Sequence, residues 1–309
     1  MIVTVTMNPA IDKTVEITSL VRGGLNRIKH VELDAGGKGI NVSKTVCELG
    51  GKTIATGFLG GNSGKVIESV LSEREITCDF VWVAGETRTN TKVFEENGDV
   101  TELNEPGVVP SEAQLEELMQ KLDGYAGEET LFVLAGSVPG SVDKGIYGEI
   151  IKRVHAKGAK VLLDADGELF KKALSAGPDI IKPNRVELEE YAGYTESASE
   201  EELLVIARRF IAEGIGNVVI SMGKEGAMFV KADRAIKCPA LKVKAHSTVG
   251  AGDAMVAALA YSWDNQLEDA ATMKLCIATS AGAVTTVGTK PPTRELVDEL
   301  QQNVEVVVL

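Results

Sequence analysis

The stretch of the chain best suited to chemistry is HSTVGAGDAM, residues 246 to 255. Gly250, Ala251 and Gly252 precede a single acid, Asp253, and the apolar run that follows is typical of a helix. The first N–H groups of such a helix have no acceptor within it, and its dipole attracts anions such as phosphate. A carboxylate beside that phosphate can accept a proton from a hydroxyl, as phosphoryl transfer to an alcohol requires. Asp253 acting only as a cap of its own helix explains this local pattern equally well.

Two common phosphate-binding motifs are excluded at other glycines. The segment GGNSGKV at 60–66 has the wrong spacing for a P-loop, and Val66 stands where a hydroxyl is needed. The dinucleotide motif G-x-G-x-x-G fails at Met255, which stands in place of the third glycine. A phosphate site at 250–253 therefore belongs to neither of these nucleotide-binding classes.

A second glycine-rich helix entry, DAGGKGINVSK, covers residues 34–44. Gly37 and Lys38 offer backbone amides and a cation, and Asn41 in the first turns can bridge hydroxyl groups. A tight entry into a helix, without function, is the alternative interpretation of the same glycines.

The segment KPNRVELE at 182–189 places Asn184 and Glu187 on one face of a helix. An amide and a carboxylate near phosphate suit Mg²⁺ that is held largely through water. An N-cap asparagine with a capping-box glutamate accounts for the same pair.

A further segment, SMGKEGAMFV at 221–230, is predicted to contain a strand end, a turn and another strand. Its small residues Ser221, Gly223 and Gly226 suit a turn that passes over a nucleotide, although a plain hairpin fits as well.

Short apolar strands alternate with helices along most of the chain. Strands are predicted at 2–7, 53–59, 130–136, 159–165, 178–184 and 217–223, and helices at 39–49, 63–74, 142–157 and 199–213. The strands are nearly continuous apolar runs, which indicates burial on both faces. The pattern predicts an α/β fold with a doubly wound, mostly parallel sheet and helices on both faces.

Two segments, 12–34 and 86–104, break this rhythm with alternating runs around Gly23-Gly24 and Asn97-Gly98. We expect antiparallel strands that form a small β-sheet lid, although two edge hairpins without function fit too. The predicted organisation is one core of residues 1–11, 35–85 and 105–309, with the two lid segments inserted. Asp12, Arg27 and Arg88 lie near the junctions between lid and core, where charged groups would face the site.

The formal net charge of -13 argues against nucleic acid and anionic membranes as partners, since both need a positive field. The four cysteines form no CxxC pair, which favours reduced thiols over zinc binding. The sequence shows no signal peptide and no membrane span, so we expect a cytoplasmic protein.

Taken together, these stretches resemble the ribokinase-like carbohydrate kinases of the PfkB family over essentially the whole chain. AGGKGINV is similar to the N-terminal signature of that family, and STVGAGDAMVA is similar to its C-terminal one. The stretches TMNPAID, LNR, TGFLGG, TRTN and ELNEPG resemble the branch of hexose-phosphate kinases, which contains 1-phosphofructokinase and tagatose-6-phosphate kinase.

The resemblance implies a role for each matching residue. Asp253 would be the catalytic base, and the backbone of Gly250, Ala251 and Gly252 would hold the transferring phosphoryl group. The sugar would be held by Asp12, Gly37, Lys38 and Asn41, and its phosphate by Arg27, Lys38 and Arg88. Mg²⁺ and phosphate would be held by Asn184 and Glu187. The nucleotide would be bound by Ser221, Gly223 and Gly226, with residues 278–288 beside the adenine.

The implied reaction is ATP- and Mg²⁺-dependent phosphorylation of the free primary hydroxyl of a ketohexose monophosphate. Fructose 1-phosphate is the favoured substrate and tagatose 6-phosphate the alternative. A sugar-phosphate sensor without activity is a further alternative on the same fold. A homodimer that pairs through the lid is also expected.

Overall fold

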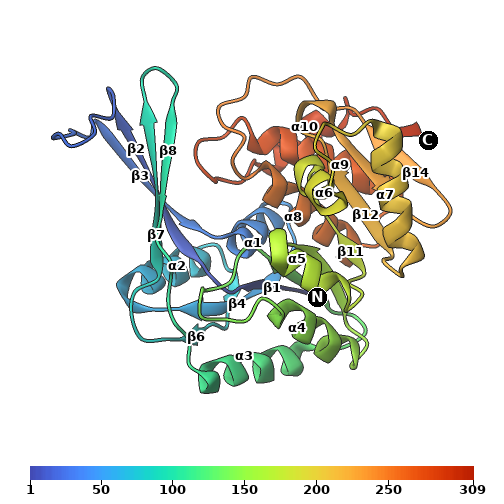
Figure 1. The fold of residues 1–309 in the computed structure, drawn as a ribbon, viewed down its shortest axis with the longest axis horizontal. Coiled ribbons are helices and arrows are strands. Elements are labelled where there is room, and N and C mark those ends of the chain that lie inside the picture. The colour runs from blue at the N-terminus through green and yellow to red at the C-terminus, as the bar shows by residue number, and fades with distance from the viewer.

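The computed structural model describes residues 1–309, which form a large sheet between two layers of helices and a small sheet at one side (Figure 1). The strands of the large sheet are β1 (Ile2–Thr6), β4 (Thr53–Leu59), β5 (Thr77–Cys78), β6 (Val81–Trp82), β9 (Leu131–Ala135), β10 (Lys160–Asp164), β11 (Ile180–Ile181), β12 (Asn217–Ser221), β13 (Ala227–Val230), β14 (Ala235–Cys238) and β15 (Val307–Val308). Their order is β15-β14-β13-β12-β11-β10-β9-β1-β4-β5, and β6 pairs with β4. All pairs from β5 to β12 are parallel, which confirms the predicted doubly wound sheet.

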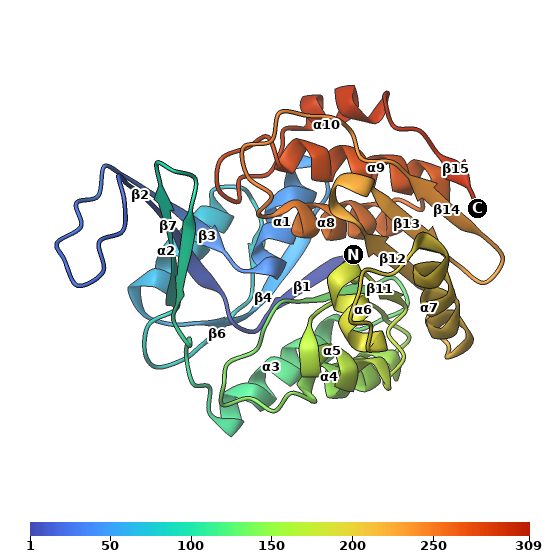
Figure 2. The same ribbon diagram turned by 45° about the horizontal axis from the view of Figure 1, so that its top comes forward.

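Helices cover both faces of this sheet, as Figure 2 shows. Val3 and Val5 of β1 pack on one face and Ile2 on the other, because successive side chains of a strand point to opposite sides. The helices on the Val3 side are α3 (Glu112–Tyr125), α4 (Ile146–His155), α5 (Gly167–Leu174), α6 (Arg185–Ala192) and α7 (Glu200–Ala212); those on the Ile2 side are α1 (Lys38–Glu48), α2 (Gly61–Ser72), α8 (Ala251–Asp264), α9 (Asp269–Ala283) and α10 (Arg294–Gln301). None of these helices combines the length and apolar character needed to cross a bilayer.

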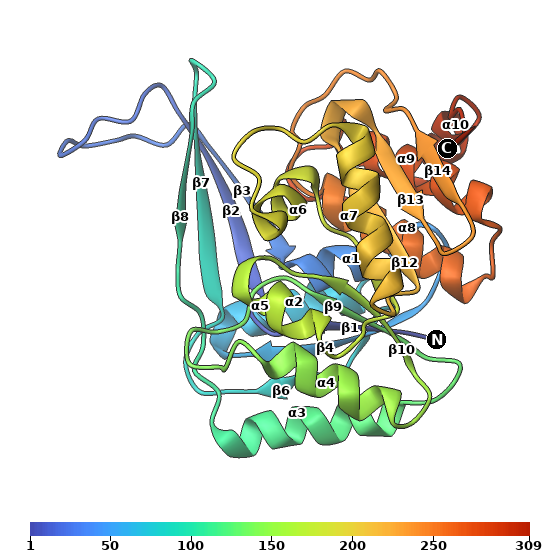
Figure 3. The same cartoon turned by 45° about the vertical axis from the view of Figure 1, so that its right-hand side comes forward.

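The small sheet has four strands, β2 (Ala10–Ile17), β3 (His30–Gly36), β7 (Arg88–Glu95) and β8 (Val100–Asn104), in the order β3-β2-β7-β8. It stands off the large sheet (Figures 1 and 3). The prediction of antiparallel pairing is wrong for one pair, because β2 and β7 run parallel. They belong to different segments and each leads outward from the core, so they arrive side by side in the same direction.

Several boundaries differ from the prediction, two of them for identifiable reasons. α2 begins at Gly61 rather than Ser63, because the Glu86 carboxylate accepts hydrogen bonds from the amides of Asn62 (3.1 Å) and Ser63 (3.0 Å). Glu86 lies 23–24 residues along the chain from these amides, so the local sequence pattern cannot predict this cap. The strand predicted at 178–184 is reduced to β11, because Pro183 cannot donate to a neighbouring strand. The helix predicted at 142–157 begins only at Ile146.

Candidate active site

Most of the residues predicted to form the site lie near the edge where the parallel strands end. β10 ends at Asp164, β12 ends at Ser221, and Lys182 directly follows β11. Helices α1 and α8 meet at the same edge, where Asn41 hydrogen-bonds to Asp253. The crevice at the carboxyl ends of the strands is where open α/β sheets bind their ligands.

Asp253 is a buried carboxylate, 9% exposed, that accepts a hydrogen bond from Nδ2 of Asn41 at 2.8 Å. It does not cap its own helix, since the N-cap of α8 is Gly250 and no side chain caps that end. Burial raises the pKa of Asp253 to about 6, and the negative charge of Asp164 adds to the effect against the opposing influence of Lys38. A carboxylate with this pKa is ionised at neutral pH and able to take up a proton, as a general base must.

The N-terminus of α8 presents unsatisfied backbone donors beside a cation. Gly250 has a φ of 84°, a left-handed conformation that favours glycine. The amides of Gly252 and Asp253 have no hydrogen-bond acceptor in the structure. A Cβ built on Gly252 would lie 3.6 Å from Nζ of Lys182, so the ammonium group lies directly against this turn. Backbone donors, helix dipole and ammonium group together attract an anion.

A buried ion network supports this end of the sheet and joins the predicted Lys38 to two residues that were not predicted, Asp164 and Lys182. Asp164 is 2% exposed and lies 3.3 Å from Nζ of Lys38 and 3.3 Å from Nζ of Lys182. Burial opposes its ionisation, but Lys182 and Lys38 together hold the pKa of Asp164 below its usual value. The pKa of Lys38 is raised, chiefly by Asp164. The one signal in the sequence is position, because both missed residues, Asp164 and Lys182, stand where a predicted strand ends.

The predicted sugar side begins with Asp12 on β2. Its Oδ1 accepts a hydrogen bond from Nδ2 of Asn90 at 3.4 Å, because Asp12 and Asn90 face each other across the β2–β7 pair. Burial raises the pKa of Asp12. A Cβ on Gly36 would stand 2.1 Å from Oδ2 of Asp12, so only glycine leaves room for this carboxylate.

Gly37 is the N-cap of α1 and has a φ of 108°, and no side chain caps that helix. A Cβ there would lie 2.9 Å from Cγ2 of Thr6. Oδ1 of Asn41 is buried without a partner, as is Oγ1 of Thr6. Buried polar atoms without partners are rare in proteins, which makes both atoms candidates for hydrogen bonds to a ligand.

Arg88 is held in a fixed place beside the lid junction. Its guanidinium donates to the carbonyl of Asn8 at 3.0 Å and to the carbonyl of Glu105 at 3.2 Å. Its Nε is buried and has no acceptor. Burial lowers the pKa of Arg88, but a guanidinium stays charged at neutral pH, and this one keeps spare donors, as a phosphate-binding arginine needs.

Arg27 is not brought to this group of residues within one chain. It is exposed and lies in the connection between β2 and β3, which projects away from the body of the molecule (Figures 2 and 3). Its part in substrate binding stays a prediction.

A cavity of about 360 Å³ opens beside the start of α8. Ala251 and Gly252 line it, and so do the three predicted turn residues Ser221, Gly223 and Gly226. The rest of the wall is mostly apolar: Ala240, Leu241, Val243, Ala245, Met255, Ile277, Ala281 and Val284, with the polar Lys224, Thr248 and Ser280. An apolar pocket that leads to an anion site fits a nucleotide, with its base in the pocket and its phosphates at the helix.

Asn184 and Glu187 form a capping box at the start of α6. Oδ1 of Asn184 accepts from the amide of Glu187 at 2.9 Å, and Oε2 of Glu187 accepts from the amide of Asn184 at 2.8 Å. The structural interpretation of this pair is therefore confirmed. The second carboxylate oxygen of Glu187 is not engaged in that box, and burial raises the pKa of the group.

The start of α6 offers few side-chain ligands for a divalent cation. The chain contains no group of three or more acidic, histidine or cysteine side chains arranged to hold a metal ion. Glu187 and Asn184 fit a cation that keeps most of its water and binds substrate phosphates, which is the usual mode of Mg²⁺.

A second, smaller cavity of about 50 Å³ lies between the lid strands and the 246–249 and 287–289 loops. The amides of His246 and Ser247 donate to the carbonyl of Val284 at 2.7 and 3.2 Å and join these loops. Val284 lines the larger cavity, whereas His246 and Ser247 line the smaller one. The joined loops are thus one wall with a cavity on each side. Lys290 also forms an ion pair with Glu32 of β3, which ties this wall to the lid.

The arrangement has the parts needed for phosphoryl transfer to a hydroxyl. A base with a raised pKa stands beside unsatisfied amides and two lysines, one cavity suits a nucleotide, and polar lid residues face the other. Stabilising the transferred group and orienting the attacking oxygen are the main tasks in such reactions.

Comparisons with known proteins agree with this assignment. A family model for pfkB family carbohydrate kinases matches residues 2–296. The chain is 34% identical over 308 residues to 1-phosphofructokinase of Vibrio cholerae, covering 100% of this chain and 97% of that protein. It is 39% identical over 279 residues to 1-phosphofructokinase of Xanthomonas campestris, covering 89% and 86%. The crystal structure of phosphofructokinase-2 from Escherichia coli with substrates and products superposes with a TM-score of 0.92 at 26% identity, covering 97% of this chain and 98% of that one. The chain therefore belongs to the pfkB family of carbohydrate kinases.

Proposed function

We propose that this kinase transfers the terminal phosphoryl group of ATP to the free primary hydroxyl of fructose 1-phosphate and so forms fructose 1,6-bisphosphate. The observation that carries the proposal is the buried carboxylate of Asp253, which lies beside the unsatisfied amides of α8. The 1-phosphofructokinase relatives of Vibrio cholerae and Xanthomonas campestris favour fructose 1-phosphate over tagatose 6-phosphate.

Each part of the site has a task in this reaction. Asp253 accepts the proton of the attacking hydroxyl on its carboxylate, and Asn41 orients that carboxylate. The amides of Gly252 and Asp253 and the ammonium of Lys182 bind the charge that develops on the transferred group. Lys38 stands on the sugar side and, with Asp164, keeps the centre balanced in charge.

The lid side binds the phosphorylated sugar. Asp12 and Asn41 accept or donate to its hydroxyl groups, and the backbone at Gly37 leaves room for its ring. Arg88 binds the phosphate that the sugar already carries, since its guanidinium is fixed by two carbonyls and retains free donors.

ATP binds in the larger cavity, against Ser221, Gly223 and Gly226. Mg²⁺ is the proposed metal, held near Asn184 and Glu187 through water. When bound, the cation neutralises part of the triphosphate charge. The protein's own contribution is to fix the nucleotide relative to the hydroxyl and to exclude water from the transferred group.

A homodimer through the lid is proposed from the two faces of the small sheet. Asp12, Glu32, Asp34 and Lys92 line the cavity on one face. The opposite face carries Val31, Leu33 and Leu103, which are 45%, 61% and 60% exposed. Exposed apolar residues gathered on one sheet face indicate an interaction surface. A second copy of the chain buries this face when two lids pack against each other. The proposed site of action is the cytoplasm.

A coupled ATPase screen tests the proposal. Purified protein is assayed with fructose 1-phosphate, tagatose 6-phosphate, fructose 6-phosphate and ribose at equal concentrations. The proposal requires the highest kcat/KM with fructose 1-phosphate. A preference for tagatose 6-phosphate would replace the substrate, and sugar-phosphate binding without turnover would make the protein a sensor.

A further inference from the structure

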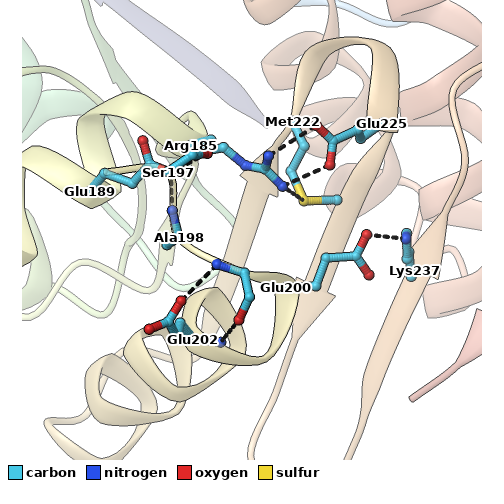
Figure 4. A network of polar contacts seen from close by, with 10 residues as sticks. Arg185, Glu189, Ser197, Ala198, Glu200, Glu202, Met222, Glu225 and Lys237 are labelled. Atoms are coloured by element: carbon cyan, nitrogen blue, oxygen red, sulfur yellow. Dashed lines mark hydrogen bonds and ion pairs between the residues drawn. The ribbon is translucent and has the colours of Figure 1, made fainter. Parts of the chain in front are cut away.

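An ion pair outside the predicted site joins the start of α6 to the turn that lines the larger cavity. Both terminal nitrogens of Arg185 lie 2.9 Å from oxygens of Glu225, one on each carboxylate oxygen (Figure 4). Arg185 also reaches Sδ of Met222 at 3.7 Å. Its side chain is only 18% exposed, whereas that of Glu225 is 40% exposed. A two-point contact of this kind fixes direction as well as distance.

The turn that Arg185 contacts closes the hairpin of β12 and β13, and Gly226 packs closely against the backbone of residues 238–240. Residues 223–225 form a short 3₁₀ turn, and its amide bonds, such as Met222 to Gly226 at 2.8 Å, stay within residues 222–226. Arg185 is the one residue outside 222–226 that hydrogen-bonds to 223–225. Gly223, Lys224 and Gly226 line the cavity, so the position of the turn sets the shape of the cavity wall.

The other end of the ion pair belongs to the capping box. Arg185 is the first residue of α6 and lies directly after Asn184, the N-cap. Asn184 also forms a bridge with Ser221, which lines the cavity. The ion pair therefore connects the segment proposed to stand near the phosphates with the turn proposed to cover the nucleotide.

The charge of Arg185 matters as well as its geometry. Glu225 lies between Lys224 and Gly226, which line a cavity proposed to take a polyanion, and an unpaired carboxylate beside that cavity would repel a polyanion. Paired with Arg185, that carboxylate is neutralised. The neighbouring Lys224, which has no ion-pair partner, is then the uncompensated charge of the turn.

We propose that Arg185 is a positioning residue for the nucleotide: it holds the 223–226 turn against α6 and neutralises Glu225 next to the larger cavity. This inference rests on the proposed role of the larger cavity as the ATP site. It predicts that the ion pair between Arg185 and Glu225, which lies outside the reacting groups, affects the binding of ATP and not the binding of the sugar phosphate.

The test compares KM for ATP with KM for fructose 1-phosphate in four variants. Arg185→Met leaves Glu225 unpaired and is expected to raise KM for ATP about tenfold, with KM for the sugar phosphate changed less than about twofold. Glu225→Gln frees the turn without leaving a negative charge, so its effect is expected to be about threefold. The double variant Arg185→Met/Glu225→Gln should resemble Glu225→Gln, and Arg185→Lys should lie between wild type and Arg185→Met.

Arg153→Met is the matched control. Arg153 of α4 forms a comparable pair with Asp123 of α3 at 2.7 Å, and neither residue lines the larger cavity. This variant is expected to keep both KM values. Equal KM for ATP in Arg185→Met and wild type would overturn the inference, and so would an equal rise of both KM values, which indicates a general loss of structure. Calorimetric titration of the wild type with ATP separates the two proposals: absence of binding overturns the proposed ATP site itself, whereas wild-type binding that is unchanged in Arg185→Met overturns only the role of Arg185.

Discussion

The Nδ2 group of Asn41 donates a hydrogen bond of 2.8 Å to Oδ2 of Asp253, although the two residues are 212 positions apart in the chain. This contact fixes one oxygen of the carboxylate and leaves the other free. It also joins α1, which follows β3 of the lid, to α8, which borders the nucleotide cavity. A proton acceptor is thus held where the two proposed substrates would meet.

Asp253→Asn is expected to lower kcat with fructose 1-phosphate by about 10²–10⁴-fold, the usual contribution of a general base. KM for ATP should change little. The measurement is a coupled assay, with Asp298→Asn on the exposed part of α10 as control. A near wild-type rate in Asp253→Asn would refute the assignment of the base.

The same substitution is expected to stabilise the protein at neutral pH. The folded pKa of about 6 exceeds the ordinary 3.8, so the folded chain takes up a proton between these values that the unfolded chain does not. Stability therefore falls as pH rises through this window, by up to about 3 kcal/mol. Asparagine cannot ionise, so Asp253→Asn should have a higher free energy of unfolding in urea at pH 7.5, by about 1–3 kcal/mol. The difference from wild type should shrink at pH 5, and a constant difference would contradict this explanation.

The kcat/KM for the sugar phosphate is expected to fall as pH drops below about 6, because Asp253 must be ionised to act. Asp164→Asn tests whether this acidic limb of the plot of kcat/KM against pH reports the ionisation of Asp253. Asp164 is the neighbouring charge that raises the pKa of Asp253, so its removal should move the limb to lower pH. A limb that does not move would belong to the phosphate of the substrate. Circular dichroism must accompany the assay, since Lys182 loses its buried partner.

Arg88→Ala is expected to raise KM for fructose 1-phosphate by about 10²-fold, because a charge-assisted contact to phosphate is lost. KM for ATP should stay within about twofold. Initial rates at varied concentrations of each substrate provide the measurement. Lys29→Ala, an exposed basic residue on the way into β3, is the control. An equal rise of both KM values would remove the role of Arg88 in sugar binding.

Leu33→Glu is expected to separate the proposed dimer into monomers, because it places a charge in the apolar face of the lid. Light scattering after size-exclusion chromatography measures the mass. Val205→Glu, on the exposed side of α7, is the control and should leave the mass unchanged. If the wild type is a monomer at micromolar concentration, the lid interface does not exist.

Much of the fold and the residues of the proposed phosphate site could be predicted from the sequence, for physical reasons. Apolar strands such as β4 are buried on both faces and end at glycines, so local pattern alone predicts 53–59. Asp253 and its glycines are adjacent in the chain, so their relation to the start of a helix is also local. Helix α9 had no predicted counterpart, because it is buried on almost every side and lacks the periodicity of a surface helix.

Contacts between segments that are distant in the chain could not be predicted from the sequence. Asp164 and Lys182 form their pair because β10 and β11 are neighbours, and nothing in either segment indicates a charged partner. The parallel pairing of β2 with β7 likewise depends on where two insertions leave the core. Asn184 and Glu187 combine a local contact with a distant one. Their capping box joins residues three apart in the chain, whereas their proposed contact with a cation does not depend on local sequence alone.

The wall in which the amide of His246 donates to the carbonyl of Val284 has a thermodynamic consequence. A ligand that shifts one side of this wall alters the free energy of binding on the other side when the second ligand binds the shifted and unshifted walls with different affinity. Linkage makes the effect reciprocal: whatever factor ATP imposes on the affinity for sugar phosphate, sugar phosphate imposes on the affinity for ATP. Cooperation between two different substrates would then reside in a single stretch of backbone that neither of them reacts with.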